Sequence, residues 1–418
     1  MAGQDGARAR QGRGHHRQAA PRARRHRDAA VRRQCHPLLR PRRRGTAAGA
    51  ISLSRVPPPL PSSTPAEQPA PPEQGTPPHA LCRLTIDLGA LRANYLALRS
   101  IVGQAECAGV VKADGYGLGL EPVVQTLLAA GCRTFFVATL DEAFRARKVT
   151  ADATIYVLGG LVLGSSAGFD ELHVRPVLAS LAEIEEWTAY AASKGRRLPA
   201  AVQIDTGMSR LGLSPAEVET LASSPGLLAG LDLALIMSHL ACADEPGHDM
   251  SREQRAAFDA ARARLPGAKA SLANSAGTFL GSTYHYDLVR PGIALYGGAA
   301  LSGVANPMKH VIKLEARILQ IRELQPGACI GYGATYSVKR PTRLATLGLG
   351  YADGYLRSLS SRGEEPGPNV LIGGSPAPIV GRVSMDLITA DVSGLAEASV
   401  VRGAWAEVIG EDVPLDMV

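Results

Sequence analysis

The sequence has 418 residues, too many for one ordinary domain, and its 45% hydrophobic fraction is enough for sizeable cores. The net charge of +7 is concentrated at one end: residues 1–45 contain fourteen Arg, no Lys and only Asp5 and Asp28 as acids, so this segment carries +12 and the rest of the chain −5. A mildly acidic remainder argues against a folded surface built to bind nucleic acid.

The six cysteines are far apart, and no two have the close spacing that is typical of zinc or redox pairs. We therefore expect reduced thiols and no metal site. No stretch approaches the roughly 18 apolar residues that span a bilayer, and residues 1–45 lack the apolar segment of a secretory signal. These features predict a soluble, cytoplasmic protein that does not bind membranes.

Residues 1–80 form an Arg-rich part followed by ten prolines between Pro57 and Pro78, without helical or strand periodicity. Such a composition cannot bury enough apolar surface to offset backbone ordering, so we expect this leader to be disordered. Binding of nucleic acid by the basic tail is the functional alternative. It is disfavoured because residues 1–80 contain no aromatic side chain on which a base could stack.

From about residue 81, short β-branched runs alternate with helical patterns eight times. Ser180 with Glu183, and Ser214-Pro215 with Glu217, predict capped helix starts. Eight strand-helix units over residues 81–311 predict a (β/α)8 barrel, an α/β fold. A doubly wound sheet is the alternative, but no Gly-x-Gly-x-x-Gly turn follows the first strand. The predicted strands are Cys107–Lys112, Thr134–Thr139, Thr154–Leu158, Arg175–Leu178, Ala200–Ile204, Leu231–His239, Ala270–Asn274 and Leu288–Tyr296.

Residues 312–418 show a different pattern. Turn pairs such as Pro326-Gly327 and Gly373-Gly374 separate short β-rich runs, and no long helical period is present. This part of the chain is predicted to be a second, all-β domain.

The first predicted barrel strand ends with Lys112, followed by Ala-Asp-Gly-Tyr-Gly. Barrel enzymes place catalytic groups at the C-terminal ends of their strands. A lysine that is partly desolvated there has a lowered pKa, which general-base action and Schiff-base chemistry both require. The structural alternative is a lysine whose stem packs on the strand end while its amine reaches solvent.

This lysine segment and seven later segments, in the same order, resemble the motifs of the alanine racemase family. The resemblance covers residues 82–418 and spans both predicted domains. The later segments are Asp205–Gly212, Ser238–Asp244, Ala273–Ala276, Val289–Gly297, Gly331–Thr335, Gly350–Gly354 and Gly381–Asp386.

The resemblance implies a homodimer that uses pyridoxal 5'-phosphate. Lys112 would carry the cofactor as an aldimine and act as the base on one face of the substrate's α-carbon. Tyr332, supplied by the partner subunit, would be the base on the other face, since racemisation removes a proton from one side and returns it from the other. His239 would lie within hydrogen-bonding reach of that tyrosine; alternatively, it is a histidine satisfied in the barrel interior.

By the same resemblance, Arg290 would face the pyridine nitrogen of the cofactor. A guanidinium donates a hydrogen bond without transferring its proton, so the nitrogen would stay neutral and the ring would withdraw fewer electrons. This favours reprotonation over decarboxylation, and it disfavours a barrel decarboxylase, which would have an acidic partner at this position. Without the motif, a surface ion pair would be the simpler interpretation of Arg290.

Further cofactor contacts are implied around the phosphate. Short Gly-rich loops at strand ends present backbone N–H groups to an anion. The residues concerned are Tyr116, Asn274, Ser275, Gly292 and Ile293.

Arg210 would contact the substrate carboxylate. Tyr351, Met385 and Asp386 of the partner subunit would form a narrow entrance that admits a methyl side chain. The alternative is that these three side chains pack inside the second domain, which would leave the specificity undetermined.

Two features depart from the family pattern. Gln203 stands where many members have a carbamylated lysine; its amide can accept a hydrogen bond from Arg210 but supplies no negative charge. The chain also ends at Val418, before a basic, tyrosine-bearing segment of the family, so we expect a truncated second domain with an unpaired sheet edge.

The resemblance therefore implies an isomerase that interconverts L-alanine and D-alanine and supplies D-alanine for peptidoglycan. A broad-specificity amino-acid racemase of the same fold is one alternative, to be separated by rates on other amino acids. A pyridoxal-phosphate-binding protein without turnover is another; the large second domain with Tyr332 argues against it.

Overall fold

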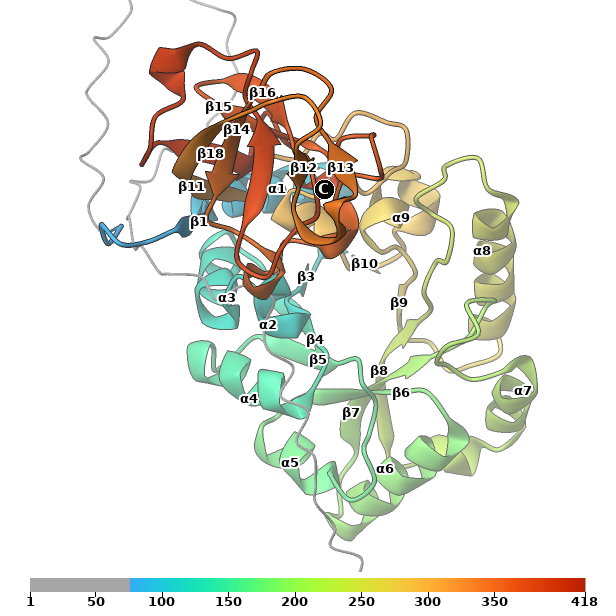
Figure 1. Ribbon diagram of the computed structural model, residues 1–418. Coiled ribbons are helices and arrows are strands. Elements are labelled where there is room, and N and C mark those ends of the chain that lie inside the picture. The colour runs from blue at the N-terminus through green and yellow to red at the C-terminus, as the bar shows by residue number, and fades with distance from the viewer. Residues whose placement is uncertain (1–75, 418) are drawn as a thin grey trace, which may run out of the picture. The chain divides into compact units, whose positions relative to one another are not determined.

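The computed structural model describes residues 76–417 (Figure 1). Most of the leader predicted to be disordered lies outside this range. Its last residues, 76–80, form a turn in which the Ala80 amide donates to the Pro77 carbonyl over 2.9 Å. The Ala80 carbonyl accepts from Nε of Arg317 over 2.9 Å, so the described fold begins a few residues earlier than expected.

A barrel of parallel strands follows, as predicted. Within residues 76–417, strands β3 to β9 pair in parallel and in chain order, and β10 pairs in parallel with β2. The amide of Arg290 donates to the Ala273 carbonyl over 2.9 Å, which joins the ends of β9 and β10 and closes the ring. The strands are β2 (Glu106–Cys107), β3 (Gly109–Val110), β4 (Thr134–Val137), β5 (Thr154–Val157), β6 (Arg175–Leu178), β7 (Leu198–Gln203), β8 (Leu231–Met237), β9 (Lys269–Ser271) and β10 (Leu288–Val289).

β2 and β3 are two halves of one strand position. The Ala108 amide between them donates to the Val289 carbonyl, and the Val110 amide donates to the Pro291 carbonyl, so the pairing with the β10 side continues across the break. Counted in this way, the described barrel has the eight strand positions that the sequence predicted.

The barrel strands are buried on both faces. All four side chains of β4 are buried; Phe135 belongs to the layer between strands and helices, and Phe136 to a separate core inside the barrel. Because successive side chains of a strand point to opposite faces, a strand covered on both sides is a continuous apolar run. This is why the barrel strands could be recognised in the sequence.

Helices lie outside the ring of strands (Figure 1). Ser180 caps α6 by accepting from the Glu183 amide, and Ser214 with Glu217 forms a complete capping box at α7, as predicted. At α6 the box is incomplete, because the Glu183 carboxylate accepts from the Ala179 amide instead of returning to Ser180. The helices are α1 (Leu88–Val102), α2 (Lys112–Tyr116), α3 (Leu120–Ala129), α4 (Leu140–Val149), α5 (Ser166–Glu171), α6 (Leu181–Ser193), α7 (Pro215–Ser223), α8 (Asp249–Arg262) and α9 (Ser275–Phe279).

The second domain is all-β, as predicted. Its main sheet has the order β16-β15-β18-β11-β14-β17, and its strands pair antiparallel. The long strand β11 pairs with β14 and β18, and its pairing with β14 shifts register between Ile318 and Gln320. The strands are β11 (Ile312–Leu324), β12 (Cys329–Ile330), β13 (Tyr336–Ser337), β14 (Thr342–Leu347), β15 (Asn369–Ile372), β16 (Ser375–Pro378), β17 (Ile388–Asp391) and β18 (Trp405–Ile409).

Strand β1 (Cys82–Ile86) differs from the prediction, which assigned residues 81–311 to the barrel. It joins the sheet of the second domain and pairs antiparallel with β11, from Cys82 opposite Ala316 to Ile86 opposite Ile312. Arg83 reinforces this pairing through an ion pair with Glu315, its cross-strand neighbour, over 2.6 Å. The chain therefore contributes to the second domain before it enters the barrel.

Short 3-10 segments occupy several loops that matter below, among them η3 (Ile293–Tyr296), η4 (Tyr332–Ala334) and η5 (Tyr351–Asp353). Across residues 76–417, no helix has the length and apolar character needed to cross a bilayer.

Candidate active site

Four basic side chains gather at the C-terminal ends of the barrel strands. Lys112 follows β3, Arg210 follows β7, His239 follows β8 and Arg290 follows β10. Burial, and then the charge of Arg210, lower the pKa of Lys112. Burial, and then the charges of Arg290, Arg210 and Lys112, lower the pKa of His239 to about 3. These effects place Arg290, Arg210 and Lys112 within electrostatic reach of His239, and Arg210 within reach of Lys112.

Lys112 stands at the start of an unusual turn. The predicted strand Cys107–Lys112 ends at Val110, and the four residues after Lys112 have φ between 55° and 63°. Three of these, Ala113, Asp114 and Tyr116, are not glycine, and the left-handed conformation costs each of them about 1–2 kcal/mol. Strain of this kind persists only where surrounding contacts hold it, and it clusters at functional sites.

Arg290 is buried inside the barrel mouth, with 3% of its surface exposed. The surface ion pair considered above is therefore excluded, and no carboxylate contacts the guanidinium within the described chain. Burial lowers the pKa of Arg290 to about 9, so the group stays charged at neutral pH. Its hydrogen-bond partners are the hydroxyl of Ser271, the carbonyls of Ser238 and Leu272, and Nδ1 of His239 at 3.4 Å.

His239 is held from two sides. Nδ1 faces the Arg290 guanidinium, and the backbone carbonyl accepts from Nε2 of Gln254 over 2.9 Å. A cation next to Nδ1 requires this nitrogen to be the acceptor, so the ring is neutral and carries its proton on Nε2. The imidazole is thus part of the basic cluster, and the contact with Arg290 satisfies Nδ1, as the alternative of a histidine satisfied in the barrel interior also expects.

Ser275, Gly292 and Tyr116 lie together. The Ser275 hydroxyl accepts from the amides of Gly292, at 2.8 Å, and Ala294, at 3.3 Å. The Tyr116 hydroxyl lies directly over Gly292: a β-carbon there would be 2.2 Å from it, so only glycine fits. The Tyr116 ring stacks on Tyr296 with centroids 4.3 Å apart. The two amides orient the Ser275 hydroxyl, and the hydroxyls of Ser275 and Tyr116 are the donors that this cradle offers to a ligand.

Asn274 and Ile293 flank this cradle. Asn274 is the N-cap of α9: its side chain accepts from the Gly277 amide and donates to the Leu240 carbonyl. Both ends of the Asn274 amide therefore have backbone partners, and its effect on a ligand acts through Ser275. Ile293 begins η3 and is partly exposed beside Gly292.

The Arg210 side chain is exposed, and hydrogen bonds fix the backbone of the loop that carries it. The Asp205 carboxylate accepts from the amides of Gly207, at 2.9 Å, and Ser209, at 3.1 Å, which fixes the turn ahead of Arg210. The hydrogen bond expected between Gln203 and Arg210 is not formed. Instead, the Gln203 side chain donates to the Leu211 carbonyl over 2.9 Å and so braces the backbone next to Arg210.

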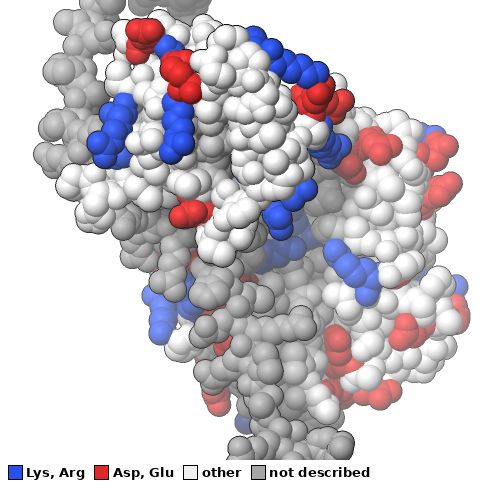
Figure 2. Space-filling model, in the orientation of Figure 1, with Lys and Arg blue, Asp and Glu red and all other residues white. Residues whose placement is uncertain are grey.

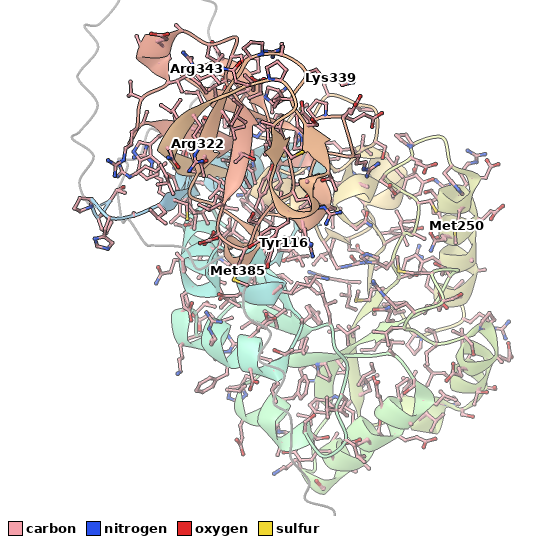
Figure 3. The ribbon with its side chains drawn as sticks, in the orientation of Figure 1. Tyr116, Met250, Arg322, Lys339, Arg343 and Met385 are labelled. Atoms are coloured by element: carbon pink, nitrogen blue, oxygen red, sulfur yellow. The ribbon has the colours of Figure 1, made fainter. Side chains whose placement is uncertain are left out.

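The predicted site residues of the second domain are exposed. Tyr332, Met385 and Tyr351 are 69%, 57% and 42% exposed, and Asp386 is exposed as well. Two of their loops are joined, because the Tyr351 amide donates to the Ser384 carbonyl and the Ala352 amide to the Met385 carbonyl. Met385 lies on one of these loops, whereas Tyr116 lies on the turn after the first barrel strand (Figure 3).

The alternative in which Tyr351, Met385 and Asp386 pack inside the second domain is therefore wrong. Within residues 76–417, no hydrogen bond or ion pair links these side chains or Tyr332 to Lys112 or His239. The structure thus brings the barrel residues together and leaves the second-domain residues exposed.

The sequence did not reveal several residues that build this site. Phe136 lies below Arg290, 5.9 Å from its guanidinium, and stacks on Tyr156 at 5.0 Å. Ser271 and Tyr296 were also missed. Alternation along the predicted strands could have placed Phe136 and Tyr156 on one face, but no sequence signal distinguishes the inside of a barrel from its helix-covered side.

The site is suited to an anion. In Figure 2, several Lys and Arg side chains lie in the recessed middle of the face shown, and Asp and Glu side chains lie mostly toward its margins. A buried guanidinium without a carboxylate partner can donate to an acceptor atom deep in the barrel. The hydroxyls of Ser275 and Tyr116 can take the anionic end of a ligand, and Lys112 supplies an amine in the same basic cluster as Arg290.

Comparisons with known proteins show the family to which the chain belongs. Residues 86–300 match the family described as "Alanine racemase, N-terminal domain", and residues 311–418 match "Alanine racemase, C-terminal domain". The chain is 48% identical over 334 residues to "Alanine racemase, catabolic" of Agrobacterium fabrum, covering 80% of this chain and 85% of the relative. It is 48% identical over 339 residues to "Alanine racemase" of Rhodospirillum rubrum, covering 81% and 89%.

Solved structures are similar over the same range. An alanine racemase from Bartonella henselae with covalently bound pyridoxal phosphate is 40% identical, with a TM-score of 0.77, and the match covers 81% of this chain and 93% of that one. A biosynthetic alanine racemase from Pseudomonas aeruginosa is 34% identical, with a TM-score of 0.75 and coverage of 81% and 92%.

The low pKa of His239 has a measurable consequence. The unfolded chain takes up a proton on this ring near pH 6.5 and the folded chain does not, so His239 reduces the stability of the fold as the pH falls from about 6.5 toward 3. In ¹⁵N-histidine-labelled protein we expect the His239 ring, assigned by its loss in His239→Asn, to stay neutral from pH 8 to about 5. Titration with a midpoint near 6.5 would contradict the basic cluster.

Proposed function

Since the chain belongs to the alanine racemase family, we propose that it interconverts L-alanine and D-alanine with pyridoxal phosphate held at the mouth of the barrel. One observation carries the proposal: Lys112, with a lowered pKa, stands in the same basic cluster as a buried Arg290 that has no carboxylate partner in the described chain. The same residue types were the basis of the resemblance in the sequence.

The residues present fit this cofactor. The Lys112 amine would hold it covalently, and the Arg290 guanidinium would donate to its ring nitrogen. Ser275, Tyr116 and the backbone at Gly292 and Ile293 would receive the phosphate, in the place where a β-carbon on Gly292 would meet the Tyr116 hydroxyl. Asn274 would hold Ser275 in position. When bound, pyridoxal phosphate withdraws electrons from the α-carbon and makes its proton removable.

Lys112 is suited to move that proton. Its lowered pKa increases the fraction of neutral amine at neutral pH, and only the neutral amine can accept a proton. Arg290 keeps its own proton, so a ring nitrogen bound next to it would stay unprotonated. Electron withdrawal by the ring would then be limited to what proton exchange at the α-carbon needs.

We propose that the second base is Tyr332 of the partner subunit in a homodimer. The exposure of the Tyr332 phenol, of Tyr351 and of Met385 on adjacent loops supports this, because such side chains need a covering surface. His239 would assist the incoming tyrosine. Tyr351, Met385 and Asp386 of the partner would narrow the entrance, and Arg210 would bind the substrate carboxylate. This arrangement favours a small amino acid such as alanine.

We also propose that the reaction supplies D-alanine for peptidoglycan. A reversible racemase can serve synthesis or breakdown, and the relatives are named both "catabolic" and "biosynthetic". If the role is biosynthetic, loss of the gene creates a growth requirement for D-alanine. Growth without D-alanine, combined with loss of growth on alanine as the carbon source, would indicate the catabolic role.

Replacing Lys112 by alanine tests the activity. The Lys112→Ala variant lacks both the covalent attachment and one base, so we expect racemisation to fall by at least about 10²–10⁴-fold. Lys194→Ala, at the exposed end of α6, is the matched control and should keep wild-type turnover. Rates are measured from L- and from D-alanine by chiral chromatography. Comparable rates for Lys112→Ala and the control would remove Lys112 from the chemistry.

Mixing two inactive variants tests the shared site. A dimer formed from one Lys112→Ala subunit and one Tyr332→Phe subunit has one site with both changes and one site with neither. After denaturation and co-refolding in equal amounts, we expect about a quarter of wild-type activity to return, since half of randomly formed dimers are mixed. Each variant refolded alone is the control. If the mixture is no more active than the separate variants, each site is built from one chain.

A further inference from the structure

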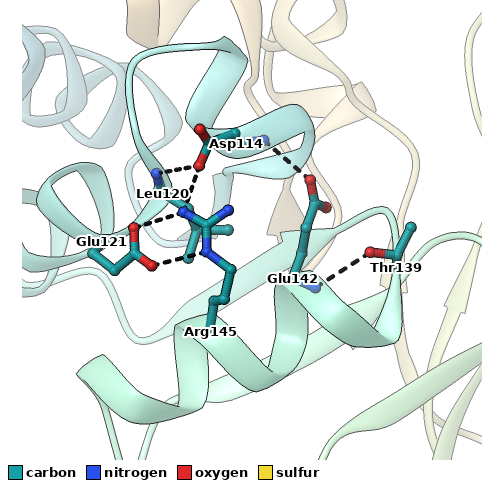
Figure 4. A network of polar contacts seen from close by, with 6 residues as sticks. All are labelled: Asp114, Leu120, Glu121, Thr139, Glu142 and Arg145. Atoms are coloured by element: carbon teal, nitrogen blue, oxygen red, sulfur yellow. Dashed lines mark hydrogen bonds and ion pairs between the residues drawn. The ribbon is translucent and has the colours of Figure 1, made fainter. Parts of the chain in front are cut away.

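The turn that carries Lys112 is tied to the neighbouring strand by one side chain. Glu142 lies in the first turn of α4, where its amide donates to the hydroxyl of the N-cap residue Thr139. One carboxylate oxygen accepts from the Ala138 amide at the end of β4, over 2.8 Å. The other accepts from the Asp114 amide, two residues after Lys112, over 3.0 Å (Figure 4). Glu142 therefore bridges the loops that follow two adjacent barrel strands.

Arg145 holds the same turn from its other side. Its guanidinium donates to the Asp114 carboxylate over 2.6 Å and to both oxygens of Glu121 in α3 over 2.7–2.8 Å (Figure 4). The Asp114 carboxylate also accepts from the Leu120 amide over 3.0 Å. Asp114 is thus fixed through its backbone by Glu142 and through its side chain by Arg145.

These contacts act where the backbone is strained. Ala113, Asp114 and Tyr116 occupy left-handed conformations that their side chains disfavour. Local bonds close the turn, from the Gly115 amide to the Val111 carbonyl and from the Gly117 amide to the Ala113 carbonyl. The Arg145 ion pair and the Glu142 bridge are the contacts that reach Asp114 from α4, so they are suited to select this conformation over a relaxed one.

A second glutamate bridges two loops in the same way elsewhere in the barrel. Glu183 occupies the corresponding position in α6, accepts from the Ala179 amide over 2.8 Å, and forms a second backbone hydrogen bond with Leu161, in the loop after β5. It therefore links neighbouring loops in the same way, but its second bond does not reach the Lys112 turn. This makes Glu183 a natural control for any effect of Glu142.

We propose that Glu142 and Arg145 are positioning residues that hold the left-handed turn and thereby fix the place of the Lys112 amine. The inference rests on the proposed function in one respect, namely that Lys112 is the reacting lysine. Its structural part, the control of the turn by α4, is independent of the reaction.

The charge of Glu142 acts on Lys112 as well, in the sense opposite to burial. Burial and Arg210 lower the pKa of Lys112, and Glu142 opposes them by raising it. A carboxylate near the amine also offsets part of the repulsion within the basic cluster. Removing the Glu142 charge therefore affects both the position and the protonation of Lys112.

Hydrogen exchange in the full-length protein, with and without pyridoxal phosphate, tests the structural part. In Glu142→Gln, whose amide can accept only one of the two bonds, we expect amides in residues 112–119 to exchange about tenfold faster or more. Glu183→Gln should leave these residues unchanged and accelerate exchange around residue 161. No acceleration at 112–119 in Glu142→Gln, or the same acceleration in both variants, overturns the proposal.

Arg145→Lys provides a second variant in case Glu142→Gln does not fold. Lysine keeps the charge but cannot grip both oxygens of Glu121 while bonding Asp114, so we expect faster exchange in residues 112–119 here too, by at least about threefold. Unchanged hydrogen exchange at residues 112–119 in Arg145→Lys would contradict the role of Arg145 in holding the turn.

Kinetic measurements test the effect of Glu142 on turnover separately from its effect on the turn. With Glu142→Gln we expect kcat to fall about tenfold while the KM for alanine changes little, because substrate contacts are untouched. Glu183→Gln should retain the wild-type kcat. An unchanged kcat in a Glu142→Gln protein with a loosened turn overturns the positioning role. If the wild-type protein itself does not racemise alanine, the proposed function fails, and the exchange result still decides whether α4 controls the turn.

Discussion

The burial of basic side chains at the mouth of the barrel is the constraint on which the site depends. Burial, and then the charge of Arg210, lower the pKa of Lys112; burial, and then the charges of Arg290, Arg210 and Lys112, lower the pKa of His239 and keep its ring neutral. The fold tolerates the buried Arg290 by surrounding it with hydroxyl, carbonyl and imidazole acceptors. Within residues 76–417 no carboxylate pairs with Arg290, so an anionic ligand is the natural complement of this charge, and its binding should stabilise the folded chain.

The two domains contribute different residues to the proposed active site. The barrel assembles its chemistry from the ends of separate strands, which rigid pairing holds in register, and a strained turn presents Lys112 among them. The second domain presents Tyr332, Tyr351 and Met385 on an exposed surface. Under the proposed function each half-site lacks what the other supplies. Each of the two subunits then supplies the base for one face of the α-carbon.

The sequence predicted the architecture well because buried parallel strands are apolar throughout and capped helices start at recognisable residues, as at Ser214. It did not predict what depends on contacts between distant segments. The left-handed turn after Lys112 is held by Glu142 and Arg145 of another helix. Asp114-Gly115 indicates a turn here, but the sequence does not show which distant residues hold it. The prediction missed that strand β1 pairs in the sheet of the second domain, because the five residues of β1 carry no signal that identifies their partner strand. Gln203 bonds to Leu211 instead of Arg210, a choice set by the path of the loop.

The most direct test of the account is to identify the lysine that holds the cofactor. Purified protein loaded with pyridoxal phosphate is reduced with borohydride, digested, and mapped by mass spectrometry. The account predicts one pyridoxyl group per chain, on Lys112, together with loss of the borohydride-sensitive visible absorption band. A modified lysine elsewhere, or a protein that retains no pyridoxyl group after reduction, would contradict the assignment of the barrel mouth as the active site.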